Sequence, residues 1–151
     1  MGDGRAQIVG ARFEHADGTP ADTLQTGETA RFIMQVRIDD ELESPVFSVT
    51  LRNTAGDVLL SATTLDDGPT GRFRAGEEVD VSLTFENYLA PDRYQATAAV
   101  SAAGSGLAWH DHREGMLSVV VTSTVHSSAL VQLPTTIDIH RESTSSGLLR
   151  T

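Results

Sequence analysis

The chain of 151 residues contains no cysteine and no lysine, and each absence excludes a kind of chemistry. Without cysteine there are no disulfides, no thiolate nucleophile and no thiolate ligands for a metal. Without lysine there is no phosphate-binding P-loop, whose motif requires that side chain, and no Schiff-base chemistry. Any ATPase that works with this protein is therefore expected outside these residues.

Long apolar runs are also missing. No stretch approaches the roughly 20 consecutive apolar residues that a membrane-spanning helix needs. Met1 is followed by Gly-Asp-Gly, with neither a basic segment nor an apolar core behind it, so we expect no signal peptide. These two observations predict a cytoplasmic protein that does not insert directly into a membrane.

Positive charge is scarce. The formal net charge is −10, from 21 acidic and 11 basic residues, and every basic residue is arginine. Binding to nucleic acid or to an anionic membrane surface normally depends on a basic surface. The charge balance therefore argues against both as partners.

Alternation of apolar and polar residues with a period of two is what the sequence has in abundance. The clearest runs lie at 30–38, 47–51, 79–86 and 94–101, and further strand candidates lie at 6–14, 57–65, 107–111, 116–122 and 129–133. Such alternation describes strands with one buried face and one wet face. Eight or nine short strands predict an all-β fold, an antiparallel β-sandwich of the jelly-roll or immunoglobulin-like kind.

The same pattern predicts the interior and excludes long helices. We expect the core to include Phe32, Val36, Phe47, Leu51, Val81, Leu83 and Val100. No segment shows the 3.6-residue period of a helix, so a helix longer than about ten residues within 28–122 would contradict this interpretation.

The chain length fits one domain. We predict a single sandwich over residues 1–139, with an end strand at about 129–134 and a polar, disordered tail over 140–151. A polar linker at 122–128 sets this end strand apart, which is the usual setting for a strand exchanged between two protomers. A homodimer with swapped end strands is therefore expected.

Several segments, taken in their order and spacing, resemble a known family. They are Ile8–Phe13 with Ala16–Pro20, Leu24–Glu28, Ser44–Val49 with Asn53–Asp57, Ala75–Glu77, Leu89–Tyr94, Trp109–His112 and Leu130–Pro134. Over about residues 6–134 the sequence resembles the C-terminal carbohydrate-binding domain of the ATPase subunit in O-antigen and related polysaccharide ABC exporters of the Wzt type.

The resemblance implies a jelly-roll or immunoglobulin-like sandwich, a dimer with exchanged end strands, and recognition of a polysaccharide before export. The implied partners are the glycan itself, an O-antigen, a teichoic acid or another surface polymer, and the ATPase and transmembrane subunits of the transporter. The domain would be a non-catalytic polysaccharide-binding module, with the ATPase in a separate domain. The alternative is a structural or protein-interaction sandwich with no glycan ligand.

Polar positions on three of the alternating strands supply the candidate binding residues. These positions are Gln35, Arg37, Ser48, Thr50, Arg52, Gln95 and Thr97. Hydroxyls, amides and guanidinium groups are suitable hydrogen-bond partners for sugar hydroxyls. We predict Arg37, Thr50, Arg52, Gln95 and Thr97 as ligand-binding residues, against the alternative of an ordinary wet sheet face.

Aromatic residues are few, so each one matters. Trp109 is the only tryptophan and is a further ligand-binding candidate, because an aromatic ring can stack on a sugar. A ring of this size in a sandwich is more often part of the core, which is the interpretation we favour. Tyr94 follows Pro91-Asp92-Arg93 and resembles the corner tyrosine that caps a sandwich by bonding to backbone.

No catalytic or metal-binding set emerges. There is no Gly-x-Ser-x-Gly nucleophile elbow, and we interpret the acidic runs Asp39–Glu43 and Asp66–Asp67 as solvated loops rather than as a glycosidase pair. His110 and His112, with Asp111 between them, offer too few ligands for a zinc site. We predict no catalytic residues, no metal and no cofactor.

Overall fold

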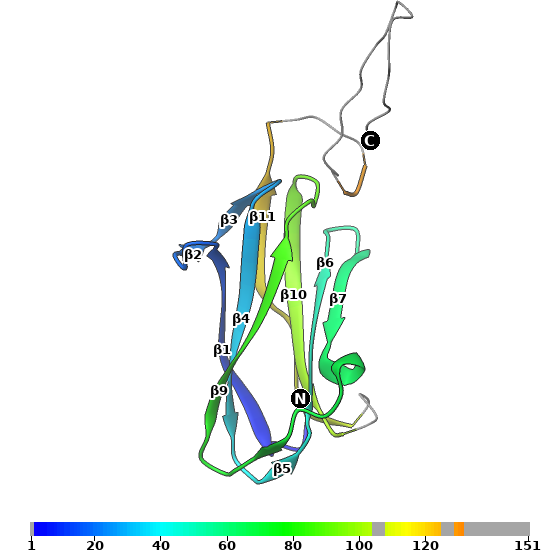
Figure 1. The fold of residues 1–151 in the computed structure, drawn as a ribbon. Helices are drawn as coiled ribbons and strands as arrows, with labels where there is room; N and C mark the ends of the chain where they lie inside the picture. Colours follow the sequence, from blue (N-terminus) through cyan, green and yellow to red (C-terminus); the bar gives the residue numbers. More distant parts are fainter. Residues whose placement is uncertain (1, 104–107, 125–128, 132–151) are drawn as a thin grey trace, which may run out of the picture.

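Two packed β-sheets form the body of the molecule in a computed structural model that describes residues 2–103, 108–124 and 129–131 (Figure 1). Sheet A contains β1 (Ala6–His15), β2 (Pro20–Ala21), β4 (Thr29–Ile38) and β9 (Glu78–Glu86), in the order β2-β1-β4-β9. Sheet B contains β3 (Thr23–Gln25), β6 (Val46–Arg52), β7 (Val58–Thr63), β10 (Asp92–Ser101) and β11 (Trp109–Thr122), in the order β3-β11-β10-β6-β7. The predicted all-β sandwich is confirmed.

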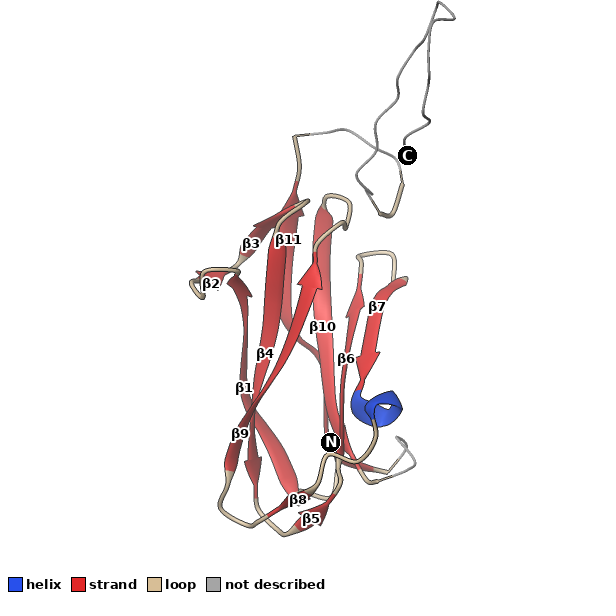
Figure 2. Ribbon diagram, in the orientation of Figure 1, coloured by secondary structure: helices blue, strands red, loops and turns tan. Residues whose placement is uncertain are grey.

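Strand pairing is antiparallel throughout both sheets except where β3 runs parallel to β11. A small pair, β5 (Leu42–Glu43) with β8 (Arg72–Phe73), closes one end of the sandwich. The only helical element among the described residues is one 3-10 turn, η1 (Thr64–Asp67), drawn in blue in Figure 2. For the described part of 28–122, the expectation of no long helix is confirmed. None of the described helical residues forms a span long and apolar enough to cross a membrane.

The core lies between the inner faces of the two sheets, as the alternation predicts. Phe32, Val36, Leu51 and Val100 are completely buried, and Phe47 is nearly so. Val81 and Leu83 also pack against this core, as predicted, but they are only partly buried and not fully interior. The reason is that β9 is the edge strand of sheet A, with no neighbour on its far side among the described strands.

One pair of predicted strands is a single strand. The candidates 107–111 and 116–122 join as β11, whose register on β10 shifts so that three residues, Glu114–Met116, stand opposite Thr97 alone. Gly115 lies at the centre of this bulge with φ +55°, a conformation that glycine adopts readily. The polar residues in mid-strand therefore marked a bulge and not a break.

The predicted end strand at 129–134 is described only in part. Val131 forms an isolated antiparallel bridge with Leu89, and the Ala90 amide donates to the Leu130 carbonyl over 3.1 Å. The remainder of that strand and the predicted tail at 140–151 lie outside the described residues.

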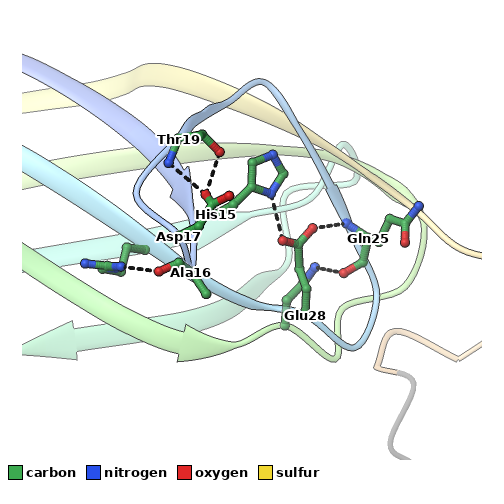
Figure 3. Close-up of polar contacts among 8 residues, drawn as sticks. His15, Ala16, Asp17, Thr19, Gln25 and Glu28 are labelled. Atoms are coloured by element: carbon green, nitrogen blue, oxygen red, sulfur yellow. Dashed lines mark hydrogen bonds and ion pairs between the residues drawn. The ribbon is translucent and has the colours of Figure 1, made fainter.

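The turn between β1 and β2 and the turn between β3 and β4 meet at one end of the sandwich, where Glu28 joins them (Figure 3). One oxygen of its carboxylate lies 2.7 Å from His15 Nδ1, and the other accepts from the Gln25 amide over 2.7 Å. Asp17 tightens the neighbouring turn by accepting from both the amide and the hydroxyl of Thr19. The hydrogen bond to Glu28 raises the pKa of His15, so the pair is ionic over a wider pH range than a free histidine would allow.

Tyr94 is the corner tyrosine that the sequence predicts. Its hydroxyl donates to the Ala90 carbonyl over 2.6 Å, and the ring is buried between the sheets. Burial, together with the charge of Asp92, raises the pKa of Tyr94 to about 12. The phenol therefore stays protonated and keeps its donor role at any physiological pH.

A buried carboxylate links the two sheets. Asp111, on β11 of sheet B, accepts from the Ile8 amide of sheet A over 2.8 Å and from Arg113 Nε over 3.0 Å. Its other oxygen accepts from the His112 amide. The Ile8 amide stands beside a register shift in the pairing of β1 with β4, so Asp111 satisfies a donor at an irregular point of the ladder.

Candidate functional site

Four of the predicted binding residues come together on the outer face of sheet B. Gln95 stands directly opposite Arg52, and Thr97 directly opposite Thr50, on the paired strands β10 and β6. The intervening residues Leu51 and Ala96, and Ala98 after Thr97, are buried in the core. Because side chains alternate along a strand, these four polar side chains point outward together.

Neighbouring strands extend this polar surface. Ser61 on β7 stands opposite Thr50, and Thr63 stands opposite Ser48. Arg93 lies on β10 two residues before Gln95 and is exposed, whereas Tyr94 between them is buried. We call this surface the sheet B face; it comprises Ser48, Thr50, Arg52, Ser61, Thr63, Arg93, Gln95, Thr97, Trp109 and His112. Ser61, Thr63 and Arg93 were missed in the sequence, although all three follow the same alternation as the residues that were predicted.

Trp109 belongs to the surface and not to the core. Its side chain is 42% exposed, and its ring stacks on the His112 imidazole with 3.8 Å between centroids and 8° between planes. His112 stands opposite Ala99 on β10. Because Ala98 and Val100 on either side of Ala99 point into the core, Ala99 and His112 face outward, and the stacked pair lies at one end of the sheet B face. The expectation of a core tryptophan was wrong because a register shift at Val100–Ser101 places Trp109 at the start of β11, beyond the last core layer.

The bulge in β11 lies over the middle of the same face. The Gly115 amide donates to the Thr97 hydroxyl over 3.0 Å, and a Cβ on Gly115 would stand 3.3 Å from the Gln95 side-chain oxygen. The bulge thus orients Thr97, whose hydroxyl retains its own proton for donation. It also borders Gln95 closely enough to limit where that amide can turn.

Arg37 is not part of this surface. It lies on β4, on the outer face of sheet A, and the whole core separates it from Arg52. Its Nε lies 2.9 Å from Asp39, which raises the pKa of the guanidinium. Gln35 lies on the same strand, so the predicted polar positions do not form one continuous surface. Alternation indicates which residues face outward but not in which sheet they lie.

The other predicted or rejected clusters are accounted for by local contacts. His110 is buried, and its Nδ1 lies 3.0 Å from the Asp3 carboxylate. Arg72 forms ion pairs with Glu41 and Glu43 in the acidic run. Within residues 2–103, 108–124 and 129–131, no three histidine, aspartate or glutamate side chains gather into a possible metal-binding group.

These features define an all-β sandwich domain with a hydrogen-bonding outer sheet face and an exposed aromatic stack at its end. The Wzt C-terminal domain family matches residues 1–133. The chain therefore belongs to the Wzt C-terminal domain family and is a domain of a Wzt-type ABC exporter, the C-terminal part that is not the ATPase.

Solved structures agree with this assignment. The crystal structure of the C-terminal domain of wzt superposes with a TM-score of 0.83 at 16% identity, covering 93% of this chain and 87% of that one, and it has the same fold. Two other solved structures are much less similar. One is the CARDB domain of a Pyrococcus furiosus protein in complex with di-metal ions, with a TM-score of 0.43 and 11% identity, covering 81% of this chain and 93% of that one. The other is a Listeria innocua β-glucosidase in complex with glucose, with a TM-score of 0.42 and 12% identity, covering 74% of this chain and 16% of that one. No curated protein matches the chain.

Proposed function

We propose that this domain is a non-catalytic module that binds the polysaccharide cargo of its ABC exporter on the sheet B face. The observation that carries the proposal is the register of β6 on β10, which sets Arg52 beside Gln95 and Thr50 beside Thr97 on one outward surface. The proposed contacts are Thr50, Arg52, Gln95, Thr97 and the exposed Trp109.

Sugar hydroxyls both donate and accept hydrogen bonds, and this face offers partners of both kinds. Threonine hydroxyls and the glutamine amide can do either, and the arginine is a donor only. The Trp109 ring presents a flat apolar surface against which a sugar ring can stack. Several weak polar contacts with little apolar burial support a modest affinity, with a Kd of about 1 mM to 1 μM.

In this proposal the domain acts in the cytoplasm, at the inner face of the membrane, together with the ATPase and transmembrane subunits. The cargo is a cell-surface glycan such as an O-antigen or a teichoic acid. The folded unit spans residues 1–139, and 140–151 form a tail.

The binding proposal is tested with two matched glutamines. Gln95→Ala on the sheet B face is expected to weaken binding about three- to tenfold, because one neutral hydrogen bond is worth about 0.5–1.5 kcal/mol. Gln35→Ala, an exposed glutamine of sheet A that also lies over a glycine, is expected to bind like the wild type. The measurement is calorimetric titration with the surface polysaccharide of the producing organism, beside thermal melts of all three proteins.

Equal binding by Gln95→Ala and Gln35→Ala would contradict the assignment of this face. No binding of the polysaccharide by the wild type would instead favour the structural or protein-interaction alternative.

We further propose that the domain is a homodimer in which the end strand at about 129–134 is exchanged between protomers. The described part of that segment supports this because it stands outside the two sheets: Val131 forms an isolated bridge with Leu89, the Ala90 amide donates to the Leu130 carbonyl, and the Leu130 residue is 53% exposed. A segment that stands outside the sheets of one protomer can pair with another protomer at low cost.

Deletion of residues 124–151 is the test of this assembly. The full chain is expected to be a dimer, and the shortened chain a monomer or insoluble, because the exchanged strand would be lost. Size-exclusion chromatography with light scattering measures the mass of each. A shortened chain that stays soluble and dimeric would show that the exchange is absent.

A further inference from the structure

Most arginines in the described part of the chain have a side-chain partner. Among the nine arginines in the described residues, six place their side chains against a carboxylate or a carbonyl: Arg5, Arg12, Arg31, Arg37, Arg72 and Arg113. The remaining three, Arg52, Arg74 and Arg93, have no side-chain partner in the described part of the chain. The net charge of −10 means that acidic side chains outnumber the arginines, so these three are unpaired although acidic partners are plentiful.

Two of these three unpaired arginines are neighbours on the sheet B face. Arg52 pairs with Gln95 across β6 and β10, and Arg93 precedes Gln95 by two residues on the same face. Such diagonal neighbours have Cα atoms about 7–8 Å apart, so two long side chains can reach one group between them. Arg74 lies elsewhere, exposed in the turn before β9.

No carboxylate faces this pair across the strands. The residues opposite Arg52 are Gln95 and Val58, and the residue opposite Arg93 is Val120. The described strands of sheet B carry three carboxylates, and none of them forms an ion pair with the side chain of Arg52 or Arg93. Asp111 is buried, Asp92 accepts from the Thr54 hydroxyl and from the Arg93 backbone amide, and Glu114 stands in the bulge beside Gln95. Asp57, in the loop before β7, is held by Asn53.

Sheet A shows the ordinary arrangement for comparison. There Arg37 stands opposite Glu78, and Arg31 stands opposite Glu14. Cross-strand pairs of opposite charge neutralise the outer face of sheet A. The two outer faces therefore differ: the arginines of sheet A are matched by acids, and Arg52 and Arg93 of sheet B are not.

We infer that Arg52 and Arg93 together bind an acidic group of the glycan, either a carboxylate or a phosphate, and that the cargo of this exporter is therefore an anionic polysaccharide. The inference rests on the proposed function and deepens it. The planar guanidinium fork matches carboxylate and phosphate geometry and gives stronger hydrogen bonds than neutral donors do. Thr50 and Gln95, beside the pair, remain for the hydroxyls of the same sugar.

Three variants of equal charge test this inference. Arg52→Gln and Arg93→Gln are each expected to weaken binding of the purified surface polysaccharide of the producing organism at least tenfold, because a hydrogen bond to a charged group is worth about 1.5–3 kcal/mol. Arg74→Gln removes the same charge from an exposed, unpaired arginine outside the face and is expected to bind like the wild type. Thermal melts of all variants check that each is folded.

Chemical treatment of the same polysaccharide separates the two acidic groups. Binding is measured with the native polymer, with a carboxyl-reduced form and with a form dephosphorylated by hydrofluoric acid. Loss of at least tenfold in affinity on carboxyl reduction assigns a uronate-type carboxylate, and the same loss on dephosphorylation assigns a phosphate. The wild-type affinity for the native polymer should also fall as salt increases.

Two outcomes would overturn the inference while the proposed function stands. In the first, affinity is unchanged after both chemical treatments, and Arg52→Gln and Arg93→Gln bind like the wild type. In the second, all three variants bind equally weakly, which would indicate an effect of net charge alone. A wild-type domain that binds none of the three polymer forms would instead overturn the proposed function itself.

Discussion

Replacing Leu51 with alanine is expected to lower the free energy of unfolding by about 2–5 kcal/mol. Leu51 lies on β6, an interior strand of sheet B, with Ala96 opposite on one side and Leu60 on the other. Its side chain is completely buried between the sheets. Alanine would lose the burial of the removed atoms and leave a cavity that rigid neighbouring strands cannot fill.

Leu83→Ala is the matched control, because it makes the same chemical change on the edge strand β9. Leu83 is only partly buried, so we expect its loss to be clearly smaller than that at Leu51. Urea unfolding followed by circular dichroism gives both values. Equal losses at the two sites would contradict the placement of β9 at an open edge of sheet A.

Replacing Asp111 with alanine is the second change with a large expected effect, a loss of about 2–3 kcal/mol in the free energy of unfolding. The carboxylate is 5% exposed and accepts from the Ile8 amide, which would be left without that acceptor. Arg113 would lose its ion-pair partner as well. Asp39→Ala removes a surface carboxylate that pairs with Arg37, and we expect it to cost less than about 1 kcal/mol.

The Asp111 effect should also depend on pH. Burial raises the pKa of Asp111, but the Ile8 amide, Arg113 and the His112 amide lower it more, so the pKa lies below its ordinary value of 3.8. A depressed pKa in the folded state means that the stabilisation is present above the unfolded pKa and is lost as pH falls through the folded value. The stability difference between wild type and Asp111→Ala should therefore be largest near neutral pH and shrink in acid below about pH 4. A difference that grows on acidification would refute this role for the carboxylate.

The candidate binding residues show what a pattern of alternation can predict. Thr50, Arg52, Gln95 and Thr97 were predicted from their polar positions within strands, and β6 pairs with β10 in a register that brings all four together. Arg37 had the same local pattern but lies on sheet A. A period of two reports the side of the strand on which a residue lies, and it contains no information about the neighbouring strand.

Departures from regular pairing explain the residues that were misjudged. Trp109 reaches the surface because β11 changes register on β10 near its first residue, and the bulge at Gly115 lies against Thr97 and Gln95. A bulge is specified jointly by two strands, so one strand's sequence does not display it fully. The sheet-linking contact from Asp111 to Ile8 spans 103 positions in the chain and has no local signature at all.

The sequence by itself determined most of the strands, the corner role of Tyr94 and the inward residues of the central strands, because each of these depends on contacts or conformations within a few neighbouring residues. Only the tertiary structure decided which outward residues share a surface. It separated Arg37 from Arg52, left Val81 and Leu83 at an open edge, exposed Trp109 and set Arg93 beside Arg52. The physical reason is that strand order and register are settled by burying all the apolar faces at once, which is a property of the whole chain and not of any one segment.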